Sequence, residues 1–148
     1  MTNSSQLIFL KGKEQALKTL FNSDNFGYLA IGFDAEDEGF TDEANKTIAE
    51  LGFKEIDGNT ESTYQEKGRL KLVYKDTQWD WDNSQVLVRF TATLPADEIT
   101  SGQNINQMAV VNNATANAAD TVFYSATSFP VFSKTASSSI TFIIGFRM

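Results

Sequence analysis

The stretch Val86-Leu-Val-Arg-Phe-Thr-Ala-Thr-Leu94 carries the clearest structural signal in this sequence. Every second residue from Val86 to Leu94 is apolar, and Arg89 and two threonines occupy most of the positions between them. A period of two is the pattern of a β-strand with one buried face. Pro95 follows at once and ends the strand, because proline cannot donate to the hydrogen-bond ladder. We therefore predict a long strand with one face in the core.

Similar patterns occur on both sides of this stretch. Alternate residues from Ile140 to Phe146 are Ile or Phe, which predicts a C-terminal strand whose Ile and Phe side chains face the core. The run Tyr28–Phe33 is almost wholly apolar and short enough for a buried strand. Further strands are expected at Arg69–Lys75, Met108–Val111 and Thr121–Thr127.

Two segments have the pattern of a short surface helix. Residues 13–21 place Ala16, Leu17, Leu20 and Phe21 on one side. Residues 42–51 have Thr41 as a candidate N-cap and a narrow apolar stripe. Strand patterns outnumber helical ones, and no linker divides the 148 residues. The prediction is a single domain of the mainly β class, an antiparallel β-sandwich with two short surface helices, in which residues 1–10 form an N-terminal arm or strand.

Composition argues against several classes of function. The net charge of −7 disfavours nucleic acid and anionic membranes as partners. The chain has no histidine and no cysteine, so it lacks the commonest general base, the commonest metal ligands and a thiol nucleophile. No apolar run has the length needed to span a bilayer, and the N-terminus does not resemble a secretory signal. We expect no catalysis, no cofactor and no metal, in a protein made in a cytoplasm.

The last third of the chain is poor in charge. Residues 101–148 contain three charged residues, Asp120, Lys134 and Arg147. Polar but uncharged surface loses less free energy than charged surface when it is buried against another protein. We therefore expect a contact surface here, with the loop 112–120 reaching a neighbour; the alternative is a mobile loop that only keeps the chain soluble. The candidate contact residues are Asn104, Asn106, Asn112, Asn113 and Asn117.

The segment Trp79-Asp-Trp-Asp82 is the second candidate site. In an extended chain both indoles lie on one face and both carboxylates on the other. Three interpretations stay open. The indoles of Trp79 and Trp81 cover the end of the core, or they anchor a protein interface, where Trp is enriched, or they stack on a sugar whose hydroxyls bind the carboxylates.

An acidic cluster precedes the second expected helix. Its carboxylates have the chemistry of a calcium site, but they lack the spacing of a calcium-binding loop. The alternative is a solvated loop whose charges favour the helix N-terminus. The cluster consists of Asp34, Glu36, Asp37, Glu38, Asp42 and Glu43.

Five short motifs together resemble small virion proteins of tailed bacteriophages. The first reads Lys-Gly-Lys-Glu-Gln-Ala-Leu-Lys-Thr-Leu-Phe, and the last two motifs are rich in Phe, Ser and Thr. The motifs lie at residues 11–21, 28–32, 88–94, 129–135 and 138–142. The resemblance covers most of the chain, and the sequence departs from it at Trp79 and Trp81 and in the Asn/Ala-rich loop.

The resemblance implies a non-enzymatic virion structural protein that decorates or stabilises the capsid. Its partners would be copies of itself and other virion proteins, such as the major capsid protein. One alternative is a fibre adaptor or host-binding module of the tail or baseplate. A third, from a different class, is a carbohydrate-binding module that uses Trp79 and Trp81.

Overall fold

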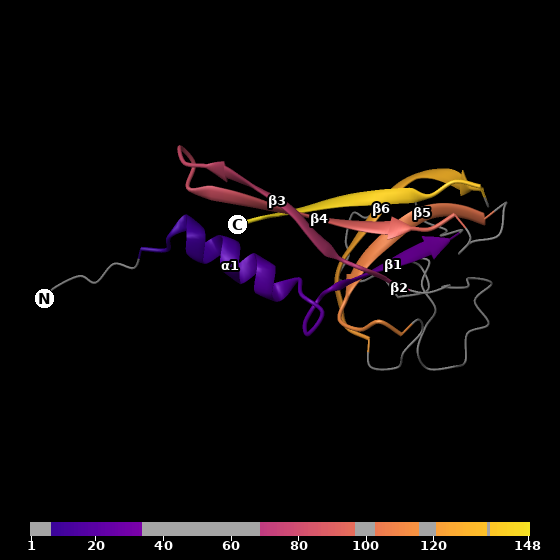
Figure 1. The fold of residues 1–148 in the computed structure, drawn as a ribbon, viewed down its shortest axis with the longest axis horizontal. Coiled ribbons are helices and arrows are strands. Elements are labelled where there is room, and N and C mark those ends of the chain that lie inside the picture. Colours follow the sequence, from indigo (N-terminus) through magenta and orange to yellow (C-terminus); the bar gives the residue numbers. More distant parts are fainter. Residues whose placement is uncertain (1–6, 34–68, 97–102, 116–120, 136) are drawn as a thin grey trace, which may run out of the picture.

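A computed structural model describes residues 7–33, 69–96, 103–115, 121–135 and 137–148. In this part of the chain one helix and seven strands form two antiparallel sheets (Figure 1). The prediction of a mainly β fold is confirmed. The helix predicted at residues 42–51 and the acidic cluster lie outside the described residues.

The first sheet, sheet A, has four strands in the order β2-β1-β5-β6. All neighbouring strands in it are antiparallel. Its two central strands bond on both sides, whereas β2 and β6 are the edges among the described strands. The strands are β1 (Tyr28–Phe33), β2 (Arg69–Lys71), β5 (Gln103–Val111) and β6 (Phe123–Lys134).

The second sheet, sheet B, has three strands in the order β3-β4-β7. The strand predicted at Val86–Leu94 is its central strand. Sheet B is longer than sheet A and extends beyond it at one end of the molecule (Figure 1). Its strands are β3 (Val73–Asp80), β4 (Gln85–Leu94) and β7 (Ile140–Arg147).

The core lies between the two sheets. The alternating apolar residues of β4 are at most 4% exposed, as their period predicts. On β7 the Ile and Phe residues at 140, 142, 144 and 146 pack against the core while the residues between them are exposed, which confirms that prediction. Leu29, Ala30 and Ile31 of β1 are all buried, so this short apolar strand is covered on both faces.

Residues 69–75 are in strands as predicted, except Leu72, but they form two strands in different sheets and not the single strand expected. Residues up to Lys71 pair with β1 in sheet A, and residues from Val73 onward pair with β4 in sheet B. Leu72 lies at the crossing, buried, with its amide donating to the Gly27 carbonyl at 2.8 Å. Apolar alternation continues across the crossing, so the sequence pattern does not indicate the change of partner strand.

Two strands are longer than predicted. β5 begins at Gln103 and not at Met108, and β6 ends at Lys134 and not near Thr127. Asn and Gln have low β-propensity, which hid the first half of β5. That half is held by backbone pairing to β6, and the next residues are held between β1 and β6.

The N-terminal helix, α1 (Leu10–Leu20), begins one turn before the predicted residue 13. It covers the part of sheet B that extends beyond sheet A (Figure 1). Leu17 and Phe21 are buried as expected, but Ala16 is exposed and Leu10 is buried in its place. The earlier start explains the difference, because the sheet continues far enough to cover another helical turn.

Candidate functional site

The two tryptophans lie together at the tip of the β3–β4 hairpin. Trp79 is near the end of β3, and Trp81 begins the turn. Their rings are stacked, with centroids 5.6 Å apart and planes inclined by 15°. Trp79 is 36% exposed and Trp81 is 68% exposed. The pair therefore presents a flat aromatic surface to the outside and does not close the core.

The turn that presents Trp81 is held by the aspartate before it. The Asp80 carboxylate accepts hydrogen bonds from the backbone N–H of Asn83 at 3.2 Å and from its Nδ2 at 2.9 Å. These bonds favour the ionised form and lower the pKa of Asp80. Ser84 completes the turn with a φ of 52°. Asp80 thus has a structural role in the turn.

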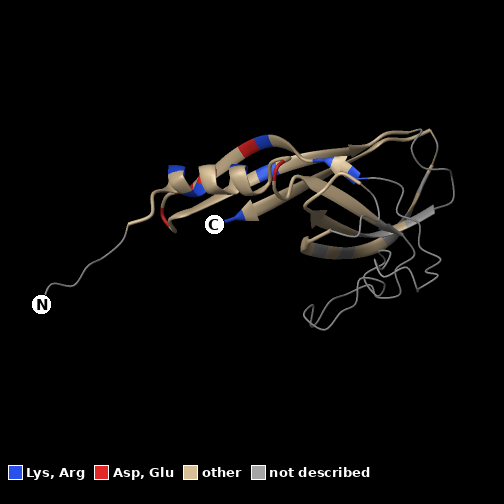
Figure 2. Ribbon diagram, turned by 90° about the horizontal axis from the view of Figure 1, so that it is seen from below, with Lys and Arg blue, Asp and Glu red and all other residues tan. Residues whose placement is uncertain are grey.

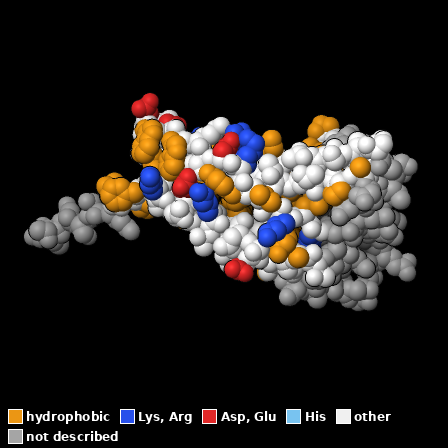
Figure 3. Space-filling model, viewed as in Figure 1, with side chains coloured by type: hydrophobic (Ala, Val, Ile, Leu, Met, Phe, Trp, Pro, Cys, Tyr) orange, Lys and Arg blue, Asp and Glu red, His pale blue; other side chains and the backbone are white. Residues whose placement is uncertain are grey.

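Exposed apolar residues also precede the helix at the same end of the molecule. Leu7, Ile8 and Phe9 are all more than half exposed. The Lys13 ammonium donates to the Ser84 carbonyl at 2.7 Å, which ties the first turn of α1 to the hairpin turn. Hydrophobic side chains gather at this end in the space-filling view (Figure 3). We call this surface the apolar end and define it as Leu7, Ile8, Phe9, Trp79 and Trp81.

A small polar cavity adjoins Trp79 at the base of the hairpin tip. Its volume is about 200 Å³. The Arg147 guanidinium donates to Gln85 Oε1 at 3.2 Å beside it. Amide, carboxylate and guanidinium groups therefore lie next to an aromatic ring. The lining residues are Gln78, Trp79, Asp80, Gln85, Leu87 and Arg147.

Two of the predicted contact asparagines are bound inside the molecule. The Asn112 side-chain oxygen accepts a hydrogen bond from the Val122 amide at 2.7 Å. Asn113 accepts one from the Arg69 guanidinium, which also donates to Thr121 Oγ1 at 3.0 Å. These bonds join β2 to both ends of the β5–β6 connection, so Asn112 and Asn113 stabilise this connection.

The other candidate asparagines lie either on a strand or outside the described residues. Asn104 and Asn106 lie on β5, and Asn104 is opposite Ser133 of β6. Asn117 and the end of its loop are outside the described residues. The described structure thus brings the two tryptophans together but does not group the asparagines with them.

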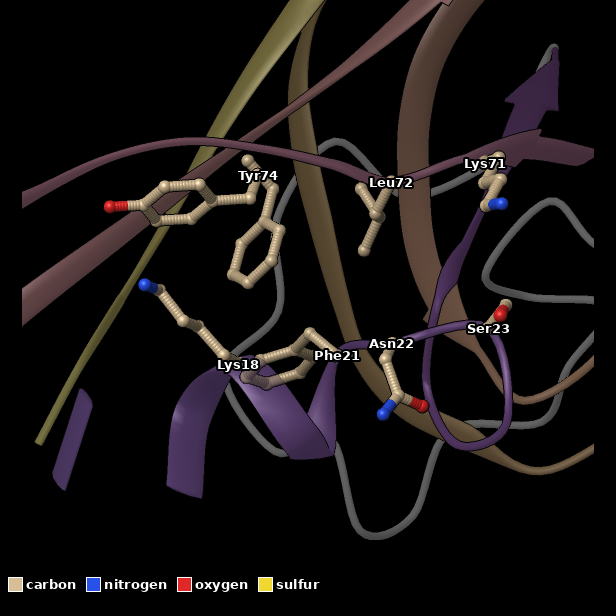
Figure 4. Close-up of a pocket in the computed structure, with 8 residues that line it drawn as sticks. Lys18, Phe21, Asn22, Ser23, Lys71, Leu72 and Tyr74 are labelled. Carbon is tan, nitrogen blue, oxygen red and sulfur yellow. The ribbon is translucent and has the colours of Figure 1, made fainter. Parts of the chain in front are cut away.

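A larger hollow of about 320 Å³ lies between the end of α1 and the β2–β3 crossing (Figure 4). Its deepest residues are the buried Phe21, Leu72 and Phe90. The Lys18 ammonium points at the Tyr74 ring, 4.1 Å from its centroid, and is 3.6 Å from the Glu14 carboxylate. The Lys18 ammonium therefore already has an acidic and an aromatic neighbour within the protein.

The distribution of charge differs between the parts of the fold. Lys, Arg, Asp and Glu mark α1 and the strands next to it, whereas β5 has none and β6 and β7 carry one each (Figure 2). Among the described residues, no three His, Cys, Asp or Glu side chains are grouped to hold a metal ion. No helix in the described ranges has the length and apolarity to cross a membrane.

Comparison with known proteins adds no functional assignment. No protein-family model matches the chain, and neither a curated protein nor a solved structure is significantly similar to it.

Trp79 and Trp81 were predicted from the sequence as a candidate site, but Leu7, Ile8 and Phe9 were not. The signal available was three consecutive apolar residues immediately before a helix whose first turn is mostly polar. These residues were expected to belong to an N-terminal arm or strand, and the hydrogen bond from Lys13 to Ser84 places that end of the helix at the hairpin tip.

Proposed function

We propose that this protein is a non-enzymatic structural protein of a tailed-bacteriophage virion, which attaches to the capsid through protein–protein contacts. The observation that supports a contact function is the apolar end. Large exposed apolar patches on soluble proteins mark interaction surfaces, and Trp is enriched among the residues that dominate binding energy. The phage assignment rests on the sequence motifs, and the apolar end supplies the surface that such an attachment needs.

The stacked pair has the properties of an interface anchor. Trp81 keeps one ring face against Trp79 and exposes the rest, so its side chain is positioned before a partner arrives. A preorganised aromatic residue loses little conformational entropy on binding. Lys13 supports the turn from the helix side, which limits movement of the tip.

Capsid binding by a double variant tests the proposal. Trp79→Ser with Trp81→Ser should weaken binding to purified capsids of the encoding phage by about thirtyfold or more, because the loss of even one interface anchor costs about 2 kcal/mol or more. Val73→Ser is the matched control, since Val73 is an exposed apolar residue of the same strand but lies outside the apolar end. Co-sedimentation over a range of protein concentrations measures both affinities.

The outcomes separate the locations on the particle. Saturable binding to capsids and none to purified tails supports decoration of the head. Binding to tails alone favours the fibre-adaptor or host-binding alternative. Binding to neither, or equal capsid binding by the double variant and the wild type, contradicts the proposal.

Carbohydrate binding is a second candidate, favoured by the polar cavity beside Trp79. Sugars are held by aromatic stacking together with polar side chains, and Gln78, Asp80, Gln85 and Arg147 supply such groups. A glycan array would detect it. A hit that Trp81→Ala and Gln85→Ala both abolish would favour this function over capsid attachment.

A further inference from the structure

The four edge strands of the two sheets differ in how well they are protected against pairing. Natural edge strands are kept from pairing with other chains by shortness, bulges, proline or charge. β2 has only three residues, β3 has a register shift between Tyr74 and Asp76, and β6 contains Pro130. β7 pairs with β4 in an unbroken register, contains no proline and has Arg147 as its one charged residue. It is the unprotected edge among the described strands.

The hydrogen-bonding groups on the outer side of β7 follow from its register. Val86 and Met148 exchange both backbone hydrogen bonds, each at 3.0 Å. In an antiparallel ladder such pairs recur at every second residue, so residues 140, 142, 144 and 146 bond to β4. The N–H and C=O groups of Thr141, Ile143, Gly145 and Arg147 therefore point away from β4. In the described part of the chain no strand pairs with them.

The side chains of β7 are also incompletely covered. Its core-facing Ile and Phe residues are only partly buried, whereas their cross-strand partners on β4 are at most 4% exposed. On the outer face Ile143 is 54% exposed. A strand added beside β7 would cover apolar side chains on both faces of the sheet and bond the outward backbone groups, as in β-strand addition.

We propose that β7 pairs antiparallel with β7 of a second copy of this chain, which joins the two copies of sheet B into one six-stranded sheet across a two-fold axis. An isologous interface of this kind uses the same strand from both copies. The residues whose backbone groups point away from β4 must lie opposite one another in the new ladder. When seven residues of each β7 strand overlap, the two-fold axis therefore passes through Ile143 or through Ile144.

Charge does not oppose the pairing of β7 with itself in this orientation. Arg147 lies at one end of the strand, so antiparallel pairing places the two arginines at opposite ends of the new interface. With the axis at Ile143 it faces Ser139 of the other copy, and with the axis at Ile144 it faces Thr141. Neither register places like charges opposite each other, which would be destabilising. Parallel pairing would bring the two arginines together.

The inference deepens the proposed function by naming one partner of a virion protein, but it stands on the sheet edge alone. It is therefore tested on the free protein, without capsids. Failure of the dimer leaves capsid attachment standing, and failure of capsid attachment leaves the dimer standing.

Sedimentation velocity at rising protein concentration tests the dimer, in roughly 0.15 M salt to screen the repulsion between acidic copies. The wild type should reach twice the 16.4 kDa mass of the chain. Ile143→Lys should remain at the single-chain mass over the same range, because it places two lysines near the axis. Val73→Lys is the matched control: Val73 is 56% exposed on the opposite edge of sheet B, and this variant should dimerise like the wild type. Circular dichroism checks that each variant is folded.

Amide hydrogen exchange on the wild type gives a second measurement that needs no variant. The amides of Ile143 and Gly145 should become protected as the concentration rises, because both point to the partner strand. A wild type that stays monomeric overturns the proposal, as does a dimer that survives Ile143→Lys, is lost equally in Val73→Lys, or leaves these two amides unprotected.

Discussion

The ion pair between Asp76 and Arg89 shows how a single pair of residues is held in this fold. The two residues are cross-strand partners on β3 and β4. Arg89 binds the carboxylate with both Nε, at 2.7 Å, and Nη2, at 2.5 Å. Hydrogen bonds from Arg89 and then from Lys75 lower the pKa of Asp76 from 3.8 to about 2. Both side chains are partly exposed, so the pair fixes local geometry more than it stabilises the fold.

The pH dependence of this pair follows from the direction of the shift. Asp76 has a lower pKa in the folded state than in the unfolded state, so its contribution to stability is complete above pH 3.8 and is lost as the pH falls through about 2. An NMR titration of the side-chain carboxyl should show a midpoint of about 2. Arg89→Gln should raise that midpoint towards 3.8, whereas Arg147→Gln, on β7, should leave it unchanged. A wild-type midpoint near 3.8 would contradict the bidentate pairing.

At the scale of elements, α1 is held more by its surroundings than by its own sequence. Phe9 precedes it without a side-chain cap. The other end is better defined: the Asn25 side-chain amide donates to the Thr19 carbonyl at 2.8 Å, and Gly27 lets the chain return closely past Asn22. Packing of an apolar side against sheet B therefore supplies most of the helix stability.

Two glycines in this region should respond oppositely to the same substitution. A Cβ at Gly12, inside the helix, meets nothing within 4 Å, so Gly12→Ala should raise the free energy of unfolding by about 0.5–1 kcal/mol. A Cβ at Gly27 would lie 2.3 Å from the Asn22 carbonyl oxygen, so Gly27→Ala should lower it. Urea denaturation measures both changes. Equal effects of the two variants would mean that the turn after α1 is not as tight as described.

The β5–β6 connection shows that composition alone does not reveal whether its asparagines bind within the molecule or face outward. Its asparagines suggested a loop that reaches a neighbour. Asn113 instead accepts a hydrogen bond from Arg69. A lysine at this position would face that guanidinium, so this loop position is unsuited to a test of assembly.

At the scale of the whole molecule, Phe21 joins the helix to both sheets. Its ring is stacked on Phe146 of β7 with a centroid distance of 3.6 Å. It meets Phe90 of β4 edge-on at 5.8 Å and Tyr124 of β6 at 5.0 Å. The ring is 1% exposed, so one side chain at the end of α1 lies where sheet A, sheet B and the helix meet.

Removal of this ring should be costly. Phe21→Ala should lower the free energy of unfolding by about 3–5 kcal/mol, since it removes a buried aromatic ring and leaves a cavity among three elements. Phe9→Ala is the matched control, because Phe9 is exposed, and it should change stability by less than about 0.5 kcal/mol. Thermal and chemical denaturation measure the change in the free energy of unfolding for both variants. Similar losses in the two variants would show that Phe21 is not the central contact.

The class of the fold and the buried faces of its regular strands follow directly from the amino-acid sequence. Alternation along Val86–Leu94 and Ile140–Phe146 names the buried residues directly, because a strand exposes every second side chain to the same side. The sequence also singled out Trp79 and Trp81, since two indoles that alternate with two aspartates stand out in a chain with no other tryptophan.

The pairing of the strands, and which of the described strands lie at sheet edges, could be known only from the three-dimensional arrangement. The change of sheet at Leu72, the extension of β5 through Asn104 and Asn106, and the position of β7 at an edge depend on contacts between residues far apart in the chain. The alternation of apolar residues shows which face of a strand is buried, but which strand lies beside it depends on how the sheets pack together. The internal bonds of Asn112 and Asn113 and the stacking of the tryptophan rings belong to the same group of features.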